Sequence, residues 1–495
     1  MQVLYKSTRS DQAPIKASQA VLKGLSDDGG LFVPDHIPAF DHSMGEFAAM
    51  DYRETAYQVM KLLLSDYTEE ELRHCIDRAY DSKFDIPTMT ALHETSHAFY
   101  YMELFHGPTL AFKDMALSIL PYLLTTAARK NGMDKEIVIL TATSGDTGKA
   151  ALAGFADVPG TRIMVFYPRE GVSTIQERQM VTQKGANTKV VGIWGNFDDA
   201  QTSVKQIFTD ESLRAEMDKK GFCFSSANSI NIGRLVPQIV YYVYAYAELL
   251  RRGRIKEGDP VNFAVPTGNF GNILAAYYAK RMGLPVGRLV CASNSNKVLF
   301  DFFKTGCYDR RRDFVLTTSP SMDILISSNL ERLLYHISGD DYRTTSRLMR
   351  QLSEEGAYEI TPQMREALDL FRGGYAEDRD TAERIHQVYE QDGYVLDPHT
   401  AVASYVYNLY VEKTGDTTPV VIDFTASPYK FERAVMSALG QSSDLPDLDL
   451  ADQLCRVSGI PVPAAISGLR TARTMHRTVC DREDMEKEVR DFLGF

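Results

Sequence analysis

A lysine inside an apolar stretch is the first residue of this sequence that could do chemistry. Lys113 lies in ELFHGPTLAFKDMALSIL, residues 103–120, with apolar residues on both sides. An amine in apolar surroundings loses part of its preference for the ammonium form and becomes a usable nucleophile and base, which an aldehyde cofactor requires. Taken alone, the pattern also fits a surface lysine whose alkyl chain covers apolar neighbours.

A glycine loop between a predicted strand and a predicted helix could bind phosphate. TGNFGNILAAYYAK, residues 267–280, follows a strand that ends near Pro266. Gly268 and Gly271 let backbone N–H groups turn inward, and a helix starting near Ile273 adds its positive end. We expect this loop to hold a phosphate; an ordinary glycine turn is the alternative.

A second loop, TATSGDTGKAAL at residues 141–152, nearly matches a nucleotide phosphate loop. It lacks the required glycine at Thr143 and the Ser or Thr at Ala150, so that interpretation fails. Its hydroxyls lie at a predicted helix N-terminus and suit a carboxylate: Thr143, Ser144 and Thr147. Asp146 would repel such a ligand, so we expect it to turn toward a donor or to cap the helix.

Two further motifs each have a structural and a functional interpretation. SSANSINIGRLVPQ, residues 225–238, places Ser and Asn donors ahead of Arg234, a set that either caps a helix or holds a phosphate. HETSH, residues 93–97, matches a zinc-peptidase pattern. That chemistry needs a helix, whereas the following AFYYMELF predicts a strand, which argues against a metal site.

The elements that must position these residues alternate between strands and helices. Short β-branched runs are followed by segments with helical spacing, and they lie at residues 136–142, 162–168, 188–194, 261–266, 288–293 and 419–424. This alternation predicts an α/β fold with a doubly wound, mostly parallel sheet and ligands at the carboxyl ends of the strands.

The predicted domains follow from the same pattern. Residues 1–100 are expected to form a mainly helical N-terminal domain, and residues 131–227 a small α/β domain. Residues 101–130 and 228–495 are expected to form the large domain, with a helical insertion near 335–395.

Composition narrows the class of partner. With 54 Lys and Arg against 66 Asp and Glu, the net charge is −12, and no long basic run is present, so nucleic acid is not an expected partner. No apolar stretch is long enough to span a membrane, and the first residues lack the apolar core of a secretory signal, so we expect a cytoplasmic location. The six cysteines are scattered, as expected for reduced thiols.

Five strings in this order resemble the threonine synthase family, pyridoxal-phosphate enzymes of the tryptophan-synthase β-like fold (fold type II): HGPTLAFKD, TSGDTG, SANSINIGR, PTGNFGN and FTASPYKF. LSDDGGLFVPDHIP and TTSPSMDILISSNLER resemble the longer bacterial and fungal branch. The resemblance implies two lobes, an extra N-terminal domain and pyridoxal 5'-phosphate as cofactor.

The resemblance also implies roles for individual residues. Lys113 would be the Schiff-base lysine, and Thr425 the hydroxyl that faces the pyridine nitrogen. The cofactor phosphate would be held by Gly268, Asn269, Phe270, Gly271 and Asn272. The substrate would be held at its carboxylate by Thr143, Ser144 and Thr147, in the loop that carries Asp146, and at its phosphate by Asn228, Ser229 and Arg234.

The activity implied is γ-elimination of phosphate from O-phospho-L-homoserine and β-addition of water, giving L-threonine. The first alternative is a serine or threonine dehydratase of the same fold, which has no substrate phosphate to bind with Arg234. A distant alternative is a zinc peptidase using His93, Glu94 and His97. By analogy with the longer branch, a monomer or weak dimer is expected.

Overall fold

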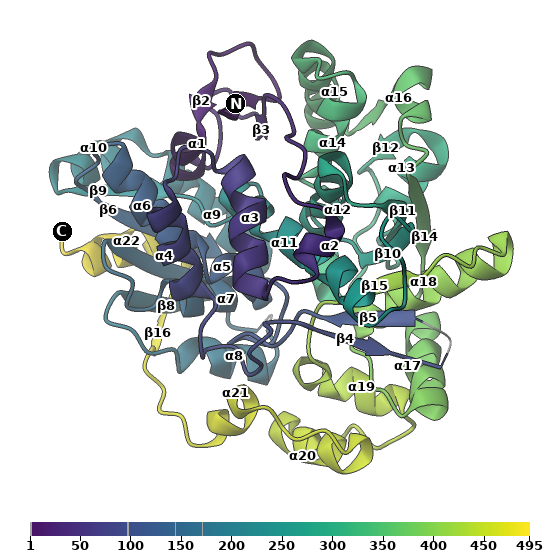
Figure 1. Ribbon diagram of the computed structural model, residues 1–495. Helices are drawn as coiled ribbons and strands as arrows, with labels where there is room; N and C mark the ends of the chain where they lie inside the picture. Colours follow the sequence, from purple (N-terminus) through teal and green to yellow (C-terminus); the bar gives the residue numbers. More distant parts are fainter. Residues whose placement is uncertain (1, 97–98, 144, 171) are drawn as a thin grey trace.

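The computed structural model describes residues 2–96, 99–143, 145–170 and 172–495. Two parallel sheets form two lobes on either side of the buried helix α11 (Ile232–Arg251) (Figure 1). Helix α11 is apolar on nearly every side, which is the pattern of a helix enclosed by protein. The α/β fold class predicted from strand and helix alternation is confirmed.

The larger lobe has a six-stranded sheet in the order β14-β11-β10-β15-β5-β4. Its strands are β4 (Ala91–Glu94), β5 (Phe99–Glu103), β10 (Val261–Pro266), β11 (Val286–Ser293), β14 (Phe371–Tyr375) and β15 (Val420–Phe424). All neighbours are parallel except β4 and β5. The helices of this lobe are α12 (Gly271–Met282), α13 (Val298–Thr305), α17 (Asp378–Asp392), α18 (Pro398–Thr414) and α19 (Glu432–Ala438).

The smaller lobe has a five-stranded parallel sheet in the order β16-β8-β7-β6-β9. Its strands are β6 (Glu136–Ala142), β7 (Thr161–Pro168), β8 (Thr188–Ile193), β9 (Phe222–Ser225) and β16 (Thr478–Cys480). Its helices are α7 (Asp146–Phe155), α8 (Thr174–Val181), α9 (Phe197–Thr209), α10 (Glu211–Lys219) and α22 (Met485–Leu493).

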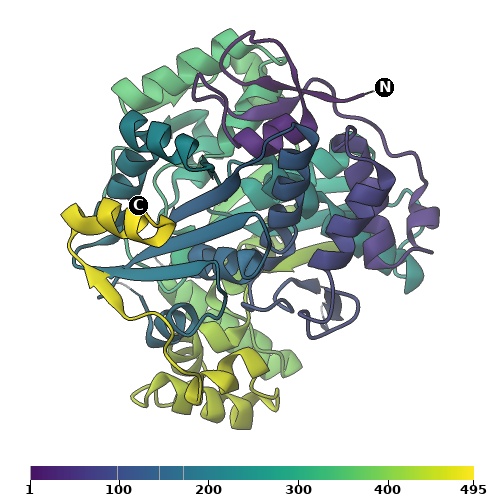
Figure 2. The ribbon, with the colours of Figure 1, turned by 90° about the vertical axis from the view of Figure 1, so that its left-hand side faces the viewer.

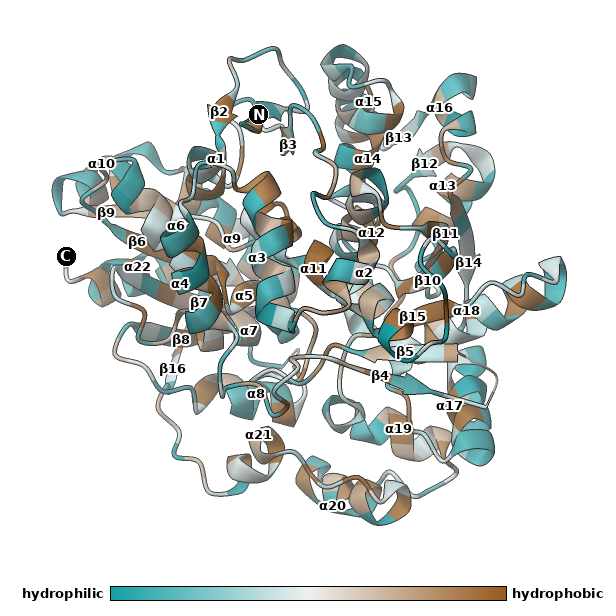
Figure 3. Ribbon diagram, viewed as in Figure 1, coloured by the Kyte–Doolittle hydropathy of each residue, from teal (hydrophilic) through white to brown (hydrophobic). Residues whose placement is uncertain are grey.

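The N-terminal part combines a small antiparallel sheet with four helices. The elements are β1 (Leu4–Ser7), β2 (Ile15–Lys16), β3 (Phe32–Pro34), α1 (Ala17–Lys23), α2 (Met44–Phe47), α3 (Tyr52–Leu63) and α4 (Glu69–Ala79). Capping boxes at Ser43 and Thr68 begin α2 and α4. Helix α4 buries Leu72, Cys75 and Ile76, and Figure 3 shows hydrophilic residues on its outer face.

The remaining elements connect or flank these parts. They are α5 (Asp114–Leu117), α6 (Leu120–Lys130), α14 (Leu330–Ile337), α15 (Tyr342–Glu354), α16 (Pro362–Glu366), α20 (Asp447–Ser458), α21 (Ala464–Ser467), β12 (Cys307–Asp309), β13 (Ala357–Glu359) and four 3-10 turns, η1 (Pro320–Met322), η2 (Pro428–Lys430), η3 (Gly468–Arg470) and η4 (Arg482–Asp484). Within the described ranges, no helix is long and apolar enough to cross a bilayer.

Three of the domain boundaries expected from sequence are corrected. Residues 478–493 were expected in the large domain, but β16 pairs with β8 and α22 packs on the small lobe, as Figure 2 shows. Residues 91–94 add β4 to the large sheet, so this sheet takes a strand from the expected N-terminal domain. The expected helical insertion contains β14, an edge strand of the same sheet. Strands β16 and β14 pair with strands that are far away in the sequence, whereas β4 pairs with the strand that follows it.

Candidate active site

The loop that carries Lys113 is fixed to the carboxyl end of β15. The Phe112 N–H donates to the Thr425 carbonyl at 2.8 Å, and the Ser427 N–H donates to the Leu110 carbonyl at 3.0 Å. Leu110 has φ of 60°, a left-handed backbone that costs a non-glycine residue of the order of 1–3 kcal/mol. This pairing brings Lys113 to the edge of the large sheet where ligands are expected, beside Thr425.

The Lys113 amine is enclosed and faces polar partners. Its side chain is 12 % exposed, and Nζ lies 3.4 Å from Ser321 Oγ and 4.0 Å from Asp146 Oδ2. Burial lowers the pKa of Lys113 to about 8, although the negative charge of Asp146 opposes this shift. A substantial fraction of the amine is therefore neutral near pH 8 and can act as a nucleophile or base.

Asp146 is held by an ion pair and does not cap its helix. Its Oδ1 lies 2.7 Å from Nζ of Lys430, whose side chain is fully buried and also donates to the Thr109 carbonyl at 2.8 Å. The N-cap position of α7 is Gly145. Burial alone would raise the pKa of Asp146, but the charges of Lys430 and Lys113 hold it well below its usual value. The expectation that Asp146 turns toward a donor is met by Lys430.

Ser321, in η1, connects the lysine to a buried histidine. The Ser321 N–H donates to His399 Nε2 at 3.1 Å, and His399 Nδ1 lies 2.7 Å from Asp397 Oδ2. This pattern makes Nε2 the acceptor and places the ring proton on Nδ1. The pairing fixes the position of Ser321, and with it the direction of its hydroxyl beside Lys113.

The glycine loop forms a tight turn against η1. A Cβ built at Gly268 would lie 2.6 Å from the Ser321 carbonyl, so a side chain does not fit there. Phe270 is the N-cap of α12, with φ of 64°, and its buried ring packs near Phe371. Helix α12 begins at Gly271, two residues before the expected start. The close turn at Gly268 and the positive end of α12 are an arrangement that suits an anion.

Two side chains of the predicted phosphate loop have partners elsewhere in the protein. Asn269 is exposed, and its side-chain oxygen accepts from the Ser328 hydroxyl at 3.4 Å. The Asn272 side chain is buried and accepts from the hydroxyl of Tyr242 at 2.5 Å. The Tyr242 hydroxyl also lies 2.6 Å from Asp423 Oδ2. Burial raises the pKa of Asp423 to about 7, while hydrogen bonds from Tyr242 and Asn272 oppose the shift.

The predicted carboxylate loop uses one of its hydroxyls internally. Thr143 Oγ1 accepts from the N–H groups of Gly145 and Gly148, each at 3.0 Å, and so organises the start of α7. Thr147 lies in the first turn of α7 and is partly buried. Ser144, which was predicted to hold the same carboxylate, lies outside the described residues.

Arg234 is a buried cation with few partners. Its side chain donates to the Ala227 carbonyl at 3.0 Å, while its Nε atom has no hydrogen-bond partner among the described residues. Burial lowers the pKa of Arg234 to about 10, so it remains charged at neutral pH. Its positive charge makes a minor contribution to the lowered pKa of Lys113, after burial and the charge of Lys430.

The other polar residues around Arg234 divide into two groups. Asn228 is exposed and Ser229 is partly buried, so both are accessible to a ligand. Asn231 is instead the N-cap of α11, because its side chain accepts from the Gly233 N–H. The capping interpretation of this loop is therefore confirmed for Asn231.

The zinc-peptidase motif begins on β4, which is an edge strand of the large sheet. His93 belongs to β4, which is antiparallel to β5, and its ring stacks on Tyr394 with centroids 3.8 Å apart. A strand does not place residues four apart on one face as a helix would. His97 is outside the described residues.

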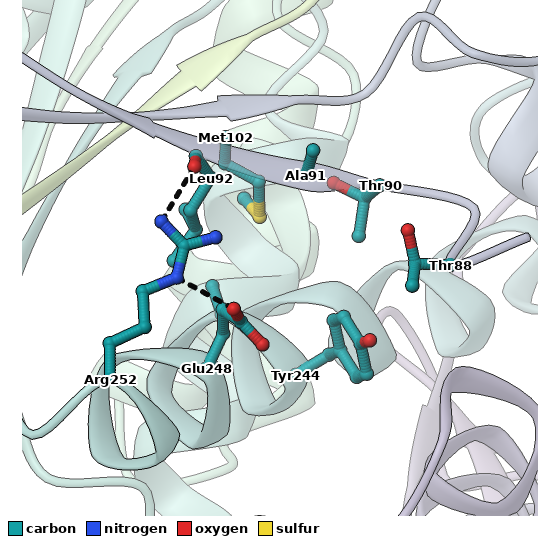
Figure 4. Close-up of a pocket in the computed structure, with 9 residues that line it drawn as sticks. Thr88, Thr90, Ala91, Leu92, Met102, Tyr244, Glu248 and Arg252 are labelled. Carbon is teal, nitrogen blue, oxygen red and sulfur yellow. Dashed lines mark hydrogen bonds and ion pairs between the residues drawn. The ribbon is translucent and has the colours of Figure 1, made fainter. Parts of the chain in front are cut away.

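A hollow of about 130 Å³ lies away from these residues, between the β4–β5 hairpin and α11 (Figure 4). Arg252 lines it, and its guanidinium donates hydrogen bonds to the Glu248 carboxylate and to the Leu92 carbonyl. No residue predicted for the site lines this hollow.

Sequence reasoning missed three residues that surround the amine: Ser321, His399 and Lys430. Ser321 and Lys430 lie within strings that carry the family resemblance, TTSPSMDILISSNLER and FTASPYKF. The signal available for Lys430 was its position in the second string, where it stands between a tyrosine and a phenylalanine. His399 follows Asp397 by two residues, which carries no recognisable pattern by itself.

Comparisons with known proteins agree along the whole chain. Residues 4–80 match the model of the threonine synthase N terminus, residues 84–425 that of the pyridoxal-phosphate dependent enzymes, and residues 400–489 that of the threonine synthase C-terminal region. The chain is 39 % identical over 477 residues to threonine synthase of Schizosaccharomyces pombe, covering 90 % of each chain. It is 37 % identical to threonine synthase of Pseudomonas aeruginosa, covering 92 % of this chain and 95 % of that one.

Solved structures show the same relationship. Pyridoxal-phosphate-bound threonine synthase from Brucella melitensis superposes with a TM-score of 0.86 at 35 % identity, covering 100 % of both chains. Threonine synthase from yeast superposes with a TM-score of 0.88 at 32 % identity, covering 99 % of this chain and 98 % of that one. The chain therefore belongs to the threonine synthase family of pyridoxal-phosphate-dependent enzymes.

Proposed function

We propose that this enzyme converts O-phospho-L-homoserine and water to L-threonine and phosphate, with Lys113 as the residue that binds the cofactor aldehyde. The observation that carries the proposal is the pair of buried cations. Lys113 has a pKa lowered to about 8, and Arg234 offers an Nε atom that has no partner among the described residues. One supplies a reactive amine, and the other suits a phosphate that arrives with the substrate.

The residues of the site fit pyridoxal phosphate. The amine of Lys113 suits its aldehyde, and the close turn at Gly268 with the N-terminus of α12 suits its phosphate. Thr425, which is 5 % exposed, offers a neutral hydroxyl for the ring nitrogen. When bound, this cofactor stores electrons released at the substrate carbons, so that protons there become removable.

The cofactor phosphate is assigned to the loop as a whole. Gly268, Phe270 and Gly271 contribute backbone N–H groups, and Asn269 lies at the rim. We assign the Asn272 side chain to support of the loop from beneath, because its oxygen accepts from buried tyrosines.

The substrate's two anionic groups are assigned to different elements. The N-terminus of α7, with Thr147, is proposed to hold the carboxylate, and Ser144 keeps the same assignment. Arg234 with Asn228 and Ser229 is proposed to hold the phosphate. Asp146 bonds Lys430, which neutralises its charge and lessens its repulsion of a carboxylate.

Lys113 is also proposed to move protons at the substrate's carbons. Its Nζ lies within reach of Ser321 Oγ, and that hydroxyl lies 3.4 Å from Asp146 Oδ2. A proton taken by the amine therefore has polar neighbours that stabilise the ammonium form. With a pKa near 8, the amine can both accept and return a proton near neutral pH.

The alternative is a dehydratase that releases a keto acid. Such an enzyme has no substrate phosphate, and a buried Arg234 whose Nε atom has no partner among the described residues would then lower stability with no ligand to compensate. We further propose that the protein is cytoplasmic. We also propose that it is a monomer or a weak dimer, and sedimentation of the purified protein would test this oligomeric state.

Two measurements test the proposal. Borohydride treatment of the coloured enzyme followed by peptide mapping should find the cofactor fixed to Lys113. Incubation with O-phospho-L-homoserine should release phosphate and threonine in equal amounts. Release of phosphate together with a keto acid would identify an eliminating deaminase instead.

Arg234→Gln separates the substrate role from the cofactor role. We expect the KM for O-phospho-L-homoserine to rise while the absorbance of the bound cofactor stays unchanged. Arg254→Gln, which removes an exposed arginine paired with Glu94, is the matched control. Loss of the cofactor from Arg234→Gln would contradict the assignment.

A further inference from the structure

A cavity of about 270 Å³ is lined by Lys149, one helical turn beyond Asp146 in α7. Helices α7 and α8, the segment after α8 and the C-terminal η3 turn surround it, and Pro108 of the lysine loop forms part of its wall. No residue assigned to the cofactor or substrate lines it. The cavity is large enough for a small organic ion but smaller than a typical drug-sized site.

The cations of this cavity lack negative partners. Lys149 Nζ donates to Gln183 Oε1 at 2.6 Å, and Lys184 is exposed at the rim. Within the described residues, neither lysine has a carboxylate within 4.0 Å, and no acidic residue lines the cavity. In a chain of net charge −12, these two lysines give the cavity a positive charge that no lining carboxylate offsets.

A buried amide adds hydrogen-bonding capacity that the protein does not use. Gln179 belongs to the lining and is 2 % exposed, yet neither its Nε2 nor its Oε1 has a partner among the described residues. Buried polar groups without partners are rare, because each costs about 1–3 kcal/mol. Because Gln179 lines the cavity, its amide is available to a group bound inside it.

We propose that this cavity binds a small molecule through a phosphate or carboxylate group, with Lys149 and Lys184 as its cationic ligands and Gln179 as a hydrogen-bond donor. An oxyanion would supply the counter-charge that both lysines lack, and it would fill the space between α7, α8 and η3. Since Pro108 lines the same cavity, an occupant touches the loop that ends at Lys113. The proposal does not rest on the identity of the substrate.

Because the pKa of Lys149 is lowered, anion binding to this cavity should change the protonation of Lys149 in a pH range where it can be measured. Burial lowers the pKa of Lys149 to about 8, with repulsion from Lys430 in the same direction and attraction by Asp114 opposing it. His476, whose Nε2 lies 3.0 Å from the Gln183 carbonyl, is also near, and its pKa is lowered by burial and by the charges of Lys189 and Lys149; Lys184 at the rim is a further charged group. A bound anion favours the ammonium form, so binding at pH 8.5 should take up protons and should weaken as pH rises further.

The experiment follows the amine itself. The holoenzyme is treated with trinitrobenzenesulfonate near pH 8, and labelling of Lys149 is measured by peptide mapping in the presence of inorganic phosphate or, separately, succinate. We expect millimolar phosphate or succinate to protect Lys149, and the more protective ion identifies the preferred group. Lys280, which donates to the Val286 carbonyl at 2.6 Å and does not line the cavity, is the unprotected control.

Two variants complete the test. Lys149→Met and Lys184→Gln should each weaken binding of the protective ion by about tenfold in calorimetry, which corresponds to about 1.4 kcal/mol, whereas Lys280→Met should not. Protection of Lys149 should persist in Arg234→Gln, which separates this site from the phosphate site of the proposed function. Absence of protection by either ion, or unchanged binding in both cavity variants, would overturn the proposal.

Discussion

The ion pair between Lys430 and Asp146 allows a prediction with opposite effects in two variants. Lys430→Met removes a cation that repels the Lys113 ammonium, so the pKa of Lys113 should rise above about 8. Asp146→Asn removes the carboxylate that attracts it, so the pKa should fall below that value. A residue that acted only through packing would not move the pKa in these two directions.

The same substitution should cost stability. Lys430 is fully buried and Asp146 is 4 % exposed at the side chain, so removing the lysine leaves a carboxylate in the protein interior. Breaking a buried pair from one side costs about 3–5 kcal/mol. We expect the lower end of this range, because Lys113 remains 4.0 Å from Asp146 as a second cation. The double variant Asp146→Asn with Lys430→Met should recover part of the loss, since no lone charge is left.

The assay uses cofactor-free protein. The rate of Lys113 modification is followed against pH by peptide mapping, and the free energy of unfolding is taken from urea titrations at pH 7. The wild-type midpoint should lie near pH 8, with the two single variants on either side of it. Equal midpoints in all three proteins, or a double variant no more stable than Lys430→Met, would refute the reasoning.

Three further predictions concern residues around the site. Gly268→Ala should weaken cofactor binding measured by absorbance titration, because its Cβ would meet a carbonyl at 2.6 Å; Gly468→Ala, in open space and with φ of −61°, is the comparison for general glycine effects. In the folded protein the pKa of the Asp423 carboxyl is raised to about 7, so between about pH 4 and pH 7 this group keeps a proton that the unfolded chain has released. The free energy of unfolding should therefore fall as pH rises through this range. Asp423→Asn should reduce the difference between the unfolding free energies measured in urea at pH 5 and at pH 8. Thr143→Val should lower the unfolding free energy by about 1–3 kcal/mol because two buried N–H groups lose their acceptor, and Thr143→Ser should not.

Local sequence patterns were sufficient to predict where the strands lie and to select Lys113 as a candidate residue. The runs at 136–142 and 261–266 coincide with β6 and β10. The apolar neighbours of Lys113 alone also fit a surface lysine, and the expectation of a buried amine came from these neighbours together with the two glycine loops. These features depend on neighbours in sequence, so the sequence displays them directly.

Features that depend on distant pairings could not be predicted in this way. Ser321 reaches Lys113 across 208 positions of sequence, and Lys430 reaches the Thr109 carbonyl across 321. The orientation of Asn272 was equally hidden, because its direction is set by Tyr242 from another helix. Motif spacing identified the loop but could not show which side chains face the ligand.

The edge strand β16 has a consequence for biosynthesis. Strand β8 ends at Ile193, but its partner β16 begins only at Thr478. At a translation rate of about 5–20 residues per second, about 15–60 s pass between the synthesis of β8 and that of β16. Throughout that interval β8 presents unpaired backbone groups to other nascent chains. Translation stopped before residue 478 should therefore yield a product whose unfinished small lobe is a substrate for chaperones and proteases, even though every residue assigned to catalysis has already been made.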